Sequence, residues 1–280
     1  MNESLLFSYR DEQLNFHHTV TPSPDPDTFP FRLHSHHMHE LYYFVSGDAD
    51  FTIEGITYPL TKGTLILSAG GQVHHSTVRN TGIPYERIVL MYTMSLSPDW
   101  AEELLAAAER GHHVFRLGER EQVWFEESCM AIEGGAKEDA ERGESLRALL
   151  SMILTKIKSL SAFSAAGEDT ENETVREIVR YVNRNLTSPL SLSLLEREFF
   201  RDKATLNRLF KSVMGCGIWE YVIRKRIFNA RQELYLSGNV NSAFLSSGFG
   251  DYSVFYRNYV RITGLSPSAD LKRLRSGDRN

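Results

Sequence analysis

The sequence predicts an α+β chain of two domains: an N-terminal antiparallel β-barrel followed by helices, and an all-α C-terminal domain. Two observations predict this class. Short runs of β-branched and aromatic residues fill the stretch from Phe31 to Tyr92, and one helical motif occurs twice in the last third of the chain. An internal repeat indicates architecture directly, because each copy is one structural unit. A length of 280 residues is also typical of two domains.

The first strands are predicted from short apolar runs separated by glycine turns. We expect strands over 41–45, 49–53, 57–60, 64–67 and 86–92, with His74 on a further strand. Their close and even spacing is typical of an antiparallel sandwich or barrel. The Pro-rich stretch 21–30 is expected to be a lead-in loop or arm.

From Ser97 the apolar period becomes helical. We expect helices over 97–110, 119–132 and 144–160, and the third places a stripe of Leu and Ile on one face. Two interpretations of this stripe stay open: core packing against the sheet, or a dimerisation helix. The predicted organisation is a barrel over 1–96, a helical dimerisation or packing segment over 97–163, a linker over 164–172 and a helical domain over 173–280.

The repeated motif runs from Asp202 to Phe210 and recurs 49 residues later, from Asp251 to Tyr259. Each copy begins with an Asp placed to cap a helix and is followed by a Gly that ends it. We call the two expected helices, 203–214 and 252–263, the probe helices. Each carries one Arg beside its apolar stripe, Arg208 or Arg257. Two equivalent helices can contact two equivalent sites on a partner, and DNA presents equivalent sites once per helical turn.

A long helix over 218–237 is expected to join the probe helices. Its central 18 residues or so correspond to about 27 Å at 1.5 Å per residue. This length is on the scale of one DNA turn, about 34 Å, which separates adjacent major-groove contacts. The remaining helices of the domain are expected over 174–186, 190–199 and 241–247 and from Pro267 onward.

The net charge changes sign at the boundary between the two predicted domains, near residue 173. Residues 173–280 hold 18 Lys and Arg against 10 Asp and Glu, a net charge of +8, whereas residues 1–172 hold 13 against 26, a net charge of −13. A basic domain suits a phosphate-binding face, because neutralised phosphates release counterions. The acidic half argues against a nucleic-acid partner there.

Three further features of the sequence bear on the location of the protein in the cell. The N-terminus has neither the basic start nor the apolar run of a secretory signal, and no stretch reaches the length of a membrane span. Cys129 and Cys216 fall in different predicted domains, so we expect no disulfide and a cytoplasmic location.

The stretch from Pro189 to Pro267 resembles the tandem helix-turn-helix domain of the AraC/XylS transcription regulators. The resemblance lies in the 206–211 segment, Gly215, Gly248-Phe249, Asp251, Ser253, Phe255, Arg257, Gly264 and Pro267. It implies that base edges or nearby phosphates are contacted by Ala204, Asn207, Arg208, Tyr252, Ser253, Tyr256 and Arg257. Arg side chains suit guanine and Asn207 suits adenine, while Lys211 and Arg261 suit phosphates. The sequence departs from the family pattern at Glu196 and Phe244, where a small Ala is usual, at Tyr259-Val260, where Phe-Lys is usual, and at Asp270, near an expected aromatic residue.

A second cluster of chemistry-bearing residues lies in the N-terminal half. His34, His36, Glu40 and His74, with Gly47, Gly63 and Gly71 at their spacing, resemble the two motifs of cupin barrels. Alternate residues of a strand point to one side, so His34 and His36 are expected to share one interior. Three imidazoles and one carboxylate also form a suitable ligand set for a divalent transition metal.

These resemblances imply a transcription regulator, usually an activator, controlled by a small effector such as a sugar. In this interpretation His34, His36, Glu40 and His74 bond effector hydroxyls, Tyr42 stacks on the ring, and no cofactor is required. The alternative is a metal-binding cupin, a metal sensor or less readily a metalloenzyme, joined to a DNA-binding module; catalysis is disfavoured and we expect no enzyme. The partners expected are double-stranded DNA, the effector, a second copy of the chain and RNA polymerase, with no membrane.

Overall fold

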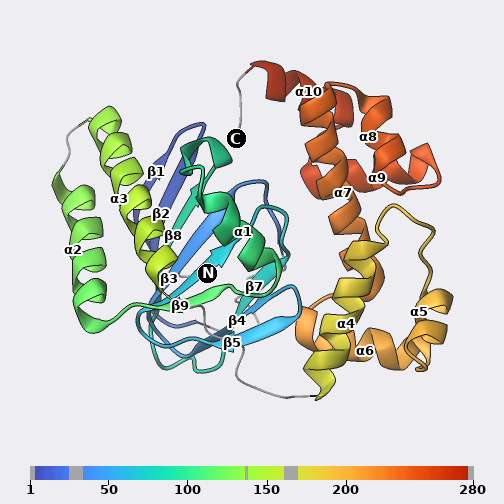
Figure 1. Cartoon of the computed structure of the whole chain (residues 1–280), viewed down its shortest axis with the longest axis horizontal. Helices are drawn as coiled ribbons and strands as arrows, with labels where there is room; N and C mark the ends of the chain where they lie inside the picture. Colours follow the sequence, from blue (N-terminus) through green and yellow to red (C-terminus); the bar gives the residue numbers. More distant parts are fainter. Residues whose placement is uncertain (1–3, 25–33, 136–137, 161–169, 277–280) are drawn as a thin grey trace. The chain divides into compact units, whose positions relative to one another are not determined.

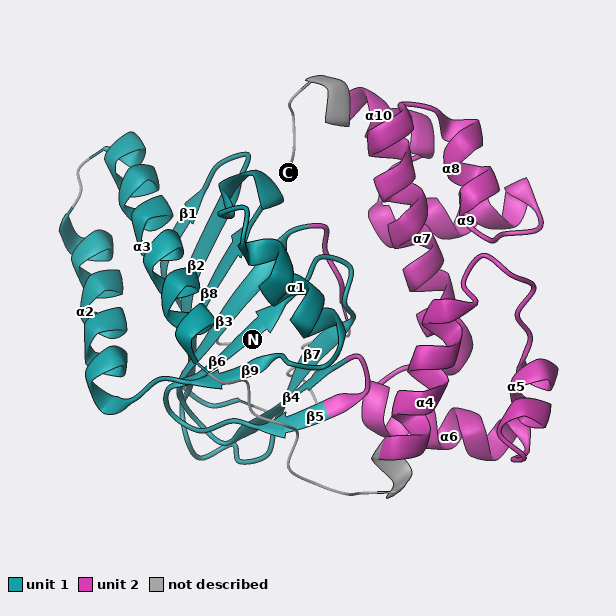
Figure 2. Ribbon diagram, viewed as in Figure 1, with its two compact units in different colours: residues 1–31, 38–53, 57–166 teal, residues 32–37, 54–56, 167–280 magenta. Residues whose placement is uncertain are grey.

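The computed structural model describes residues 4–24, 34–135, 138–160 and 170–276, and the chain divides into two compact units (Figures 1 and 2). Unit 1 comprises residues 1–31, 38–53 and 57–166, and unit 2 comprises residues 32–37, 54–56 and 167–280. The expected arm over 21–30 and linker over 164–172 lie largely outside the described residues. Among the described helices, none is long and apolar enough to cross a membrane.

Unit 1 contains two antiparallel sheets. The six-stranded sheet has the order β1-β2-β8-β3-β6-β9, and the three-stranded sheet has the order β5-β4-β7. The strands of the larger sheet are β1 (Ser4–Arg10), β2 (Leu14–Thr21), β8 (Tyr85–Tyr92), β3 (His39–Ser46), β6 (Thr64–Ser68) and β9 (Val114–Arg116). Those of the smaller sheet are β5 (Ile56–Pro59), β4 (Ala49–Ile53) and β7 (His74–Val78).

The sequence-based expectation of a closed barrel is wrong for the described residues. Both sheets have open edges, at β1 and β9 in one and at β5 and β7 in the other. The antiparallel class is confirmed, and all five expected strands are present. The expected strand through His34 and His36 is absent. His34 forms only an isolated bridge, and residues 35–38, directly before β3, are not in a strand.

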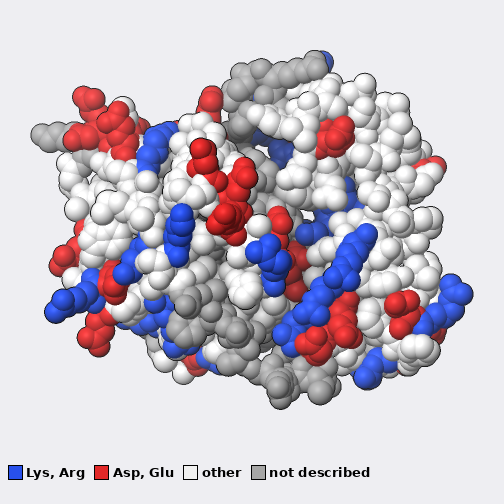
Figure 3. All heavy atoms as spheres, in the orientation of Figure 1, with Lys and Arg blue, Asp and Glu red and all other residues white. Residues whose placement is uncertain are grey.

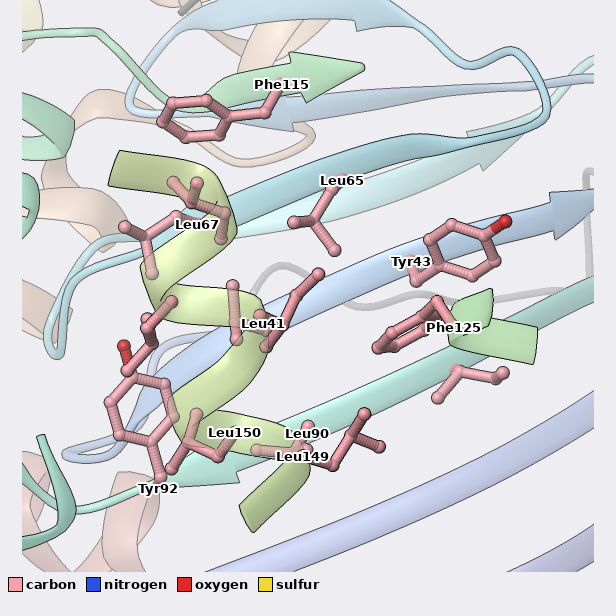
Figure 4. Close-up of a cluster of buried hydrophobic side chains, with 14 of the residues drawn as sticks. Leu41, Tyr43, Leu65, Leu67, Leu90, Tyr92, Phe115, Phe125, Leu149 and Leu150 are labelled. Atoms are coloured by element: carbon pink, nitrogen blue, oxygen red, sulfur yellow. The ribbon is translucent and has the colours of Figure 1, made fainter. Parts of the chain in front are cut away.

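One face of the larger sheet packs against helices. Leu41 and Tyr43 of β3 lie on this face with Leu65 and Leu67 of β6 (Figure 4). The helices are α1 (Ala101–Glu109), α2 (Glu119–Gly135) and α3 (Asp139–Ser159), preceded by the 3-10 turn Met94–Leu96. The Leu and Ile stripe of α3 is buried in this core from Leu146 to Ile157. The core-packing interpretation of that stripe is therefore confirmed, and it is not available as a dimer seam.

Unit 2 holds seven helices among the described residues, as the sequence predicts. They are α4 (Thr170–Arg184), α5 (Leu192–Glu198), α6 (Lys203–Met214), α7 (Ile218–Ser237), α8 (Val240–Ser246), α9 (Tyr252–Thr263) and α10 (Pro267–Ser276). The bounds of α6, α7 and α9 agree with the expected ones. Helix α7 contacts α6 on one side of the repeat and α8, α9 and α10 on the other. It therefore joins the two copies of the motif.

A buried arginine connects α7 to the turn that follows α4. Arg226 is only 5% exposed, and its Nε and Nη2 donate to the carbonyls of Leu186 and Ser188 at 2.8 and 2.9 Å. Its guanidinium lies over the rings of Trp219 and Phe249. Burial lowers the pKa of Arg226. The carbonyls and rings compensate for the water that this cation gives up on folding.

The segment Glu54–Ile56 belongs to unit 2 by its contacts. The Glu54 carboxylate accepts hydrogen bonds from the Tyr221 hydroxyl at 2.6 Å and from Asn183 Nδ2 at 2.8 Å. Lys225 Nζ lies 3.2 Å from the same carboxylate. Burial, reinforced by the carboxylate, raises the pKa of the Tyr221 hydroxyl. One carboxylate thus ties α4 to α7.

Two departures from the family pattern compensate each other in unit 2. Asp270 of α10 is fully buried, accepts a hydrogen bond from the Tyr259 hydroxyl at 2.7 Å and forms a bidentate pair with Arg231 of α7. Burial, together with the Asp270 carboxylate, raises the pKa of Tyr259. The hydroxyl that Tyr259 adds is therefore used by the carboxylate that Asp270 adds.

A third departure has a different explanation. Ala243 of α8, not Phe244, is the fully buried small residue of the second motif. The Phe244 ring lies at the edge of the same core, with ring centroids 5.3 Å from Tyr252 and 5.6 Å from Phe255. The small-residue position is therefore kept one residue earlier than the sequence comparison placed it.

We predict that Asp270→Ala destabilises unit 2 strongly. Removing the Asp270 carboxylate leaves the buried Tyr259 hydroxyl without its acceptor, which typically costs about 1–3 kcal/mol, and also breaks the ion pair with Arg231, whose side chain is 35% exposed. Urea unfolding followed by tryptophan fluorescence measures the effect, with Asp251→Ala as a control that removes only an exposed helix cap, worth about 1 kcal/mol. A loss for Asp270→Ala no larger than for Asp251→Ala contradicts this account.

Candidate DNA interface and effector site

The two probe helices, α6 and α9, are built in the same way. Asp202 Oδ1 accepts from the Thr205 amide at 2.9 Å, and Asp251 Oδ1 accepts from the Val254 amide at 2.8 Å. Gly215 and Gly264 end the helices with φ of 72° and 75°, in the left-handed region that glycine adopts without strain. Their bounds are therefore set by equivalent caps.

Each probe helix buries one face and exposes the other. Leu206, Phe210 and Met214 of α6 are buried, as are Phe255 and Tyr259 of α9. The exposed predicted DNA contacts are Ala204, Arg208 and Lys211 on α6 and Tyr252, Ser253, Tyr256, Arg257 and Arg261 on α9. Every α9 residue predicted to contact DNA is thus on its solvent face.

Arg208 and Arg257 are the matched pair of exposed cations. Within the described part of the chain, neither guanidinium has a hydrogen bond or an ion pair, although acidic side chains are present in the unit. An Arg fork with its donors unused is suited to guanine or phosphate.

Two predicted contacts have partners inside unit 2. Asn207 Oδ1 accepts from the Ile218 amide at 3.0 Å and thereby caps α7. A bidentate bond to adenine uses this oxygen as well, so Asn207 must accept two hydrogen bonds at once to contact adenine. Arg261 makes a bidentate pair with Glu220, at 3.1 and 3.0 Å, and remains 48% exposed. It must leave or share that carboxylate to reach a phosphate.

The structure adds one position that the sequence prediction missed. Lys203, at the start of α6, is exposed and occupies the place that Tyr252 has in α9. The 49-residue offset that relates Arg208 to Arg257 relates this pair too, so the signal was present. Lys203 Nζ lies 3.7 Å from Glu196 of α5, which explains how an acidic residue is accommodated at the Glu196 departure.

The second candidate site centres on β3 and β7. Glu40 and His74 are 4% and 2% exposed, and Glu40 Oε1 lies 3.6 Å from His74 Nε2. His74 Nδ1 lies 3.0 Å from the Gln72 carbonyl. A carbonyl only accepts, so Nδ1 carries the proton and donates, and Nε2 presents its lone pair toward Glu40 when the ring is neutral.

His34 and His36 complete the predicted set. Their ring centroids are 5.9 Å apart, and one ligand atom from each of His34, His36, Glu40 and His74 lies within 4.8 Å of the others. Three imidazoles and one carboxylate, with the His74 tautomer fixed by a backbone carbonyl, are a donor set that suits zinc or a similar divalent transition metal.

Tyr42 does not have the environment expected for a residue that stacks on an effector. Its ring is 2% exposed and packs on Phe51, with centroids 4.8 Å apart. Its hydroxyl makes a short hydrogen bond with the Tyr85 hydroxyl. Burial, together with Tyr85, raises the pKa of Tyr42. The side chain is therefore occupied in packing between the two sheets.

Surface charge follows the division found in the sequence. In unit 1, acidic side chains gather over the start of α3 (Figure 3), where Glu138, Asp139, Glu141 and Glu144 are exposed. In unit 2, the exposed faces of α6 and α9 carry cations and no acidic side chain between Lys203 and Lys211 or between Tyr252 and Arg261. A polyanion is attracted to the second surface and repelled by the first.

Comparisons with known proteins agree with this arrangement. A model of the AraC-like ligand binding domain matches residues 19–153, and a model of a helix-turn-helix domain matches residues 195–273. YfiF, an uncharacterized HTH-type transcriptional regulator of Bacillus subtilis, is 24% identical over 249 residues, covering 86% of this chain and 78% of YfiF. The HTH-type transcriptional activator AarP of Providencia stuartii is 28% identical over 108 residues, covering 38% of this chain and 80% of AarP.

Among solved structures, the chain is similar to an apo form of a ToxT variant from Vibrio cholerae. The two share 15% identity, with 96% of this chain and 100% of the other covered and a TM-score of 0.42. The two matched domain models define a DNA-binding transcription regulator with a ligand-binding domain. The chain belongs to the AraC family of such regulators.

Proposed function

We propose that this regulator binds a specific DNA site through both probe helices and activates transcription in response to a small effector held by unit 1. The observation that carries the DNA contact is the matched pair of exposed guanidiniums on two identically capped helices, neither of which has a partner among the described residues. Helix α7, which joins the two copies, has 20 residues and is therefore about 30 Å long. That length is close to one DNA turn.

We predict that Arg208→Ala and Arg257→Ala each weaken specific DNA binding by about 5- to 150-fold, which corresponds to about 1–3 kcal/mol for a base contact. The target is a duplex selected from random DNA with the wild-type protein, and the measurement is a gel shift at fixed salt. Lys211→Ala is expected to weaken all sequences alike and to lower the salt slope by about one unit.

Arg180→Ala is the matched control, because Arg180 is an exposed cation of the same unit that pairs with Glu173 on α4. Circular dichroism checks that each variant is folded. Unchanged gel shifts for Arg208→Ala and Arg257→Ala would reject the proposed interface.

We also propose that the protein acts as a homodimer through the outer face of α2 and α3. An open groove of about 590 Å³ runs between these helices, with Trp124 and Met152 among its lining residues. Met152, Val123 and Met130 are each more than half exposed. Glu121 and Lys156 border the groove as an ion pair at 2.8 Å, and Arg120 borders it as well; an apolar groove with a charged border suits contact with a second copy of the same surface.

We predict that Met152→Glu converts the dimer to a monomer, because a carboxylate on each copy would be buried against the other. Sedimentation equilibrium of the full chain measures the change. Leu236→Glu is the control, since Leu236 is 78% exposed but lies on α7. A wild-type protein that sediments as a monomer, or a Met152→Glu protein that still dimerises, counts against this face.

Two candidate ligands compete for the cluster of His34, His36, Glu40 and His74. The first is an organic effector with hydroxyl groups, such as a sugar, bonded by Glu40 and the three histidines. The second, a divalent transition metal, is favoured by the convergence of four ligand atoms within 4.8 Å and by the His74 tautomer. In the second case His34, His36, Glu40 and His74 hold the ion, and the protein is a metal-responsive regulator.

Elemental mass spectrometry on untagged protein purified without chelator separates the two. If the metal hypothesis is correct, we expect one equivalent of metal, lost in His36→Ala and kept in His112→Ala, which alters an exposed histidine of unit 1. His36 is not fully buried, so its variant is the better choice over His74→Ala. Absence of metal in the wild type leaves the organic effector.

A further inference from the structure

The two probe helices share one exposed arginine position and differ along a neighbouring row of residues. The shared position holds Arg208 on α6 and Arg257 on α9, which the 49-residue offset relates. The neighbouring row follows the spacing i, i+4, i+8, so its members lie along one side of each helix. We call it the variable row. Its members are, on α6, Lys203, Asn207 and Lys211, and at the equivalent positions of α9, Tyr252, Tyr256 and Val260.

The variable row of α9 is an exposed aromatic surface. Tyr252 is 45% exposed and Tyr256 is 41% exposed, and their ring centroids lie 6.3 Å apart. Apolar groups that are scattered singly over a surface are ordinary, whereas apolar groups that lie together indicate a surface that is covered by a partner. At every position of this row, α6 has a polar or cationic side chain in place of the aromatic or apolar one.

The first of these rings is held in place by two others. The Phe244 ring of α8 meets the Tyr252 ring edge-on, with centroids 5.3 Å apart and an angle of 81° between the ring planes. The Phe255 ring, which belongs to the core, lies 5.7 Å from Tyr252 by the same measure. Aromatic pairs are stabilised in tilted and edge-on arrangements at these distances. Tyr252 is therefore an oriented ring on the solvent face of α9.

The variable row of α6 is cationic instead. Lys203 and Lys211 are exposed, and Arg208 beside them gives the solvent face of this helix a third positive charge. On α9, Arg257 is exposed, but Arg261 already has a carboxylate partner. Lysine binds phosphates as a point charge, and each phosphate that is neutralised releases counterions. The electrostatic part of binding therefore falls mainly on α6.

The major groove of DNA offers one kind of group that suits each row. Base pairs present hydrogen-bond donors and acceptors there, and thymine adds its C5-methyl group. An aromatic ring placed against that methyl group removes apolar surface from water on both molecules, which a lysine or asparagine in the same place does not achieve. Phosphates and the acceptor atoms of guanine suit lysine.

We propose that the two halves of the DNA site differ in base chemistry: α9 contacts thymine methyl groups through Tyr252 and Tyr256, and α6 supplies most of the cationic contacts. The inference rests on the proposed DNA-binding function and goes beyond it by assigning a different chemistry to each probe helix. Tyr252 and Tyr256 are then specificity-determining residues. The half of the site that α9 contacts contains thymine and is not a copy of the half that α6 contacts.

Replacing every thymidine of the selected duplex by deoxyuridine removes only the methyl groups and tests this assignment. We expect the wild-type full chain to bind the uracil duplex about 4- to 15-fold more weakly, which corresponds to one or two buried methyl groups. Tyr252→Ala and Tyr256→Ala are expected to lose most of this discrimination, because the ring that covers the methyl group is removed. Tyr256→Phe keeps the ring and is expected to keep the discrimination. Fluorescence anisotropy at fixed salt measures each affinity.

Lys203→Ala and Lys211→Ala are the matched controls, because they change the same row on the other helix. We expect each to keep the full discrimination against uracil and to lower the salt slope by about one unit, whereas the tyrosine variants keep the wild-type slope. The double-mutant cycle of variant against duplex gives the coupling between ring and methyl group. Equal wild-type affinity for both duplexes, or an unchanged discrimination in both alanine variants of the tyrosines, overturns the proposal.

The gel shifts of Arg208→Ala and Arg257→Ala keep failure of this proposal distinct from failure of the proposed function. If those variants bind weakly but uracil substitution has no effect, the DNA interface stands and the thymine contacts are wrong. If uracil substitution weakens binding through the tyrosines while both arginine variants bind like the wild type, the thymine contacts stand and the proposed arginine contacts are wrong.

Discussion

The central strand β3 is covered on both faces, and this constraint governs the rest of unit 1. Its odd-numbered residues Leu41 and Tyr43 face the helices, and its even-numbered residues Glu40 and Tyr42 face the smaller sheet. From Glu40 to Phe44 the side chains of this strand are buried, so each polar one must find a partner inside. Tyr42 has one in Tyr85, and Glu40 Oε1 lies 3.6 Å from His74 Nε2. The helix-facing side is satisfied mainly by packing, so binding chemistry collects on the other side.

The corresponding constraint in unit 2 is the division of two 12-residue helices between core and solvent. Because the buried stripes of α6 and α9 fix their rotation, the exposed residues are fixed as well. Hydrogen bonds of buried polar side chains also hold the helices of the unit in place. Arg226 joins α7 to the turn after α4, and Asp270 joins α10 to α7 and α9. The departures at Tyr259 and Asp270 therefore form one buried network, in which replacing either residue alone leaves a buried polar group without its partner.

Much of this architecture was predictable from sequence. The bounds of α6 and α9 follow from caps that are local: Asp202 and Asp251 at the start, Gly215 and Gly264 at the end. The five strands between 41 and 92 were found for the same reason, since glycine turns bound them. Strand β2 was missed because His17 and His18 interrupt its apolar pattern. His18 reaches Glu86 and Glu133, which lie far from it in the sequence.

The sites were less predictable, because the deciding contacts are distant in sequence. Nothing near Asn207 shows that its oxygen caps α7 eleven residues later. Glu40 and His74 lie 34 residues apart and meet only because β3 of the larger sheet and β7 of the smaller one face each other. By contrast, Lys203 was within reach of the sequence, because the repeat offset that selects Arg208 also selects it. In a repeat, the role of a residue in one copy can therefore be assigned to the equivalent residue of the other copy. Residues that meet inside a sheet can be identified only when the pairing of the strands is known.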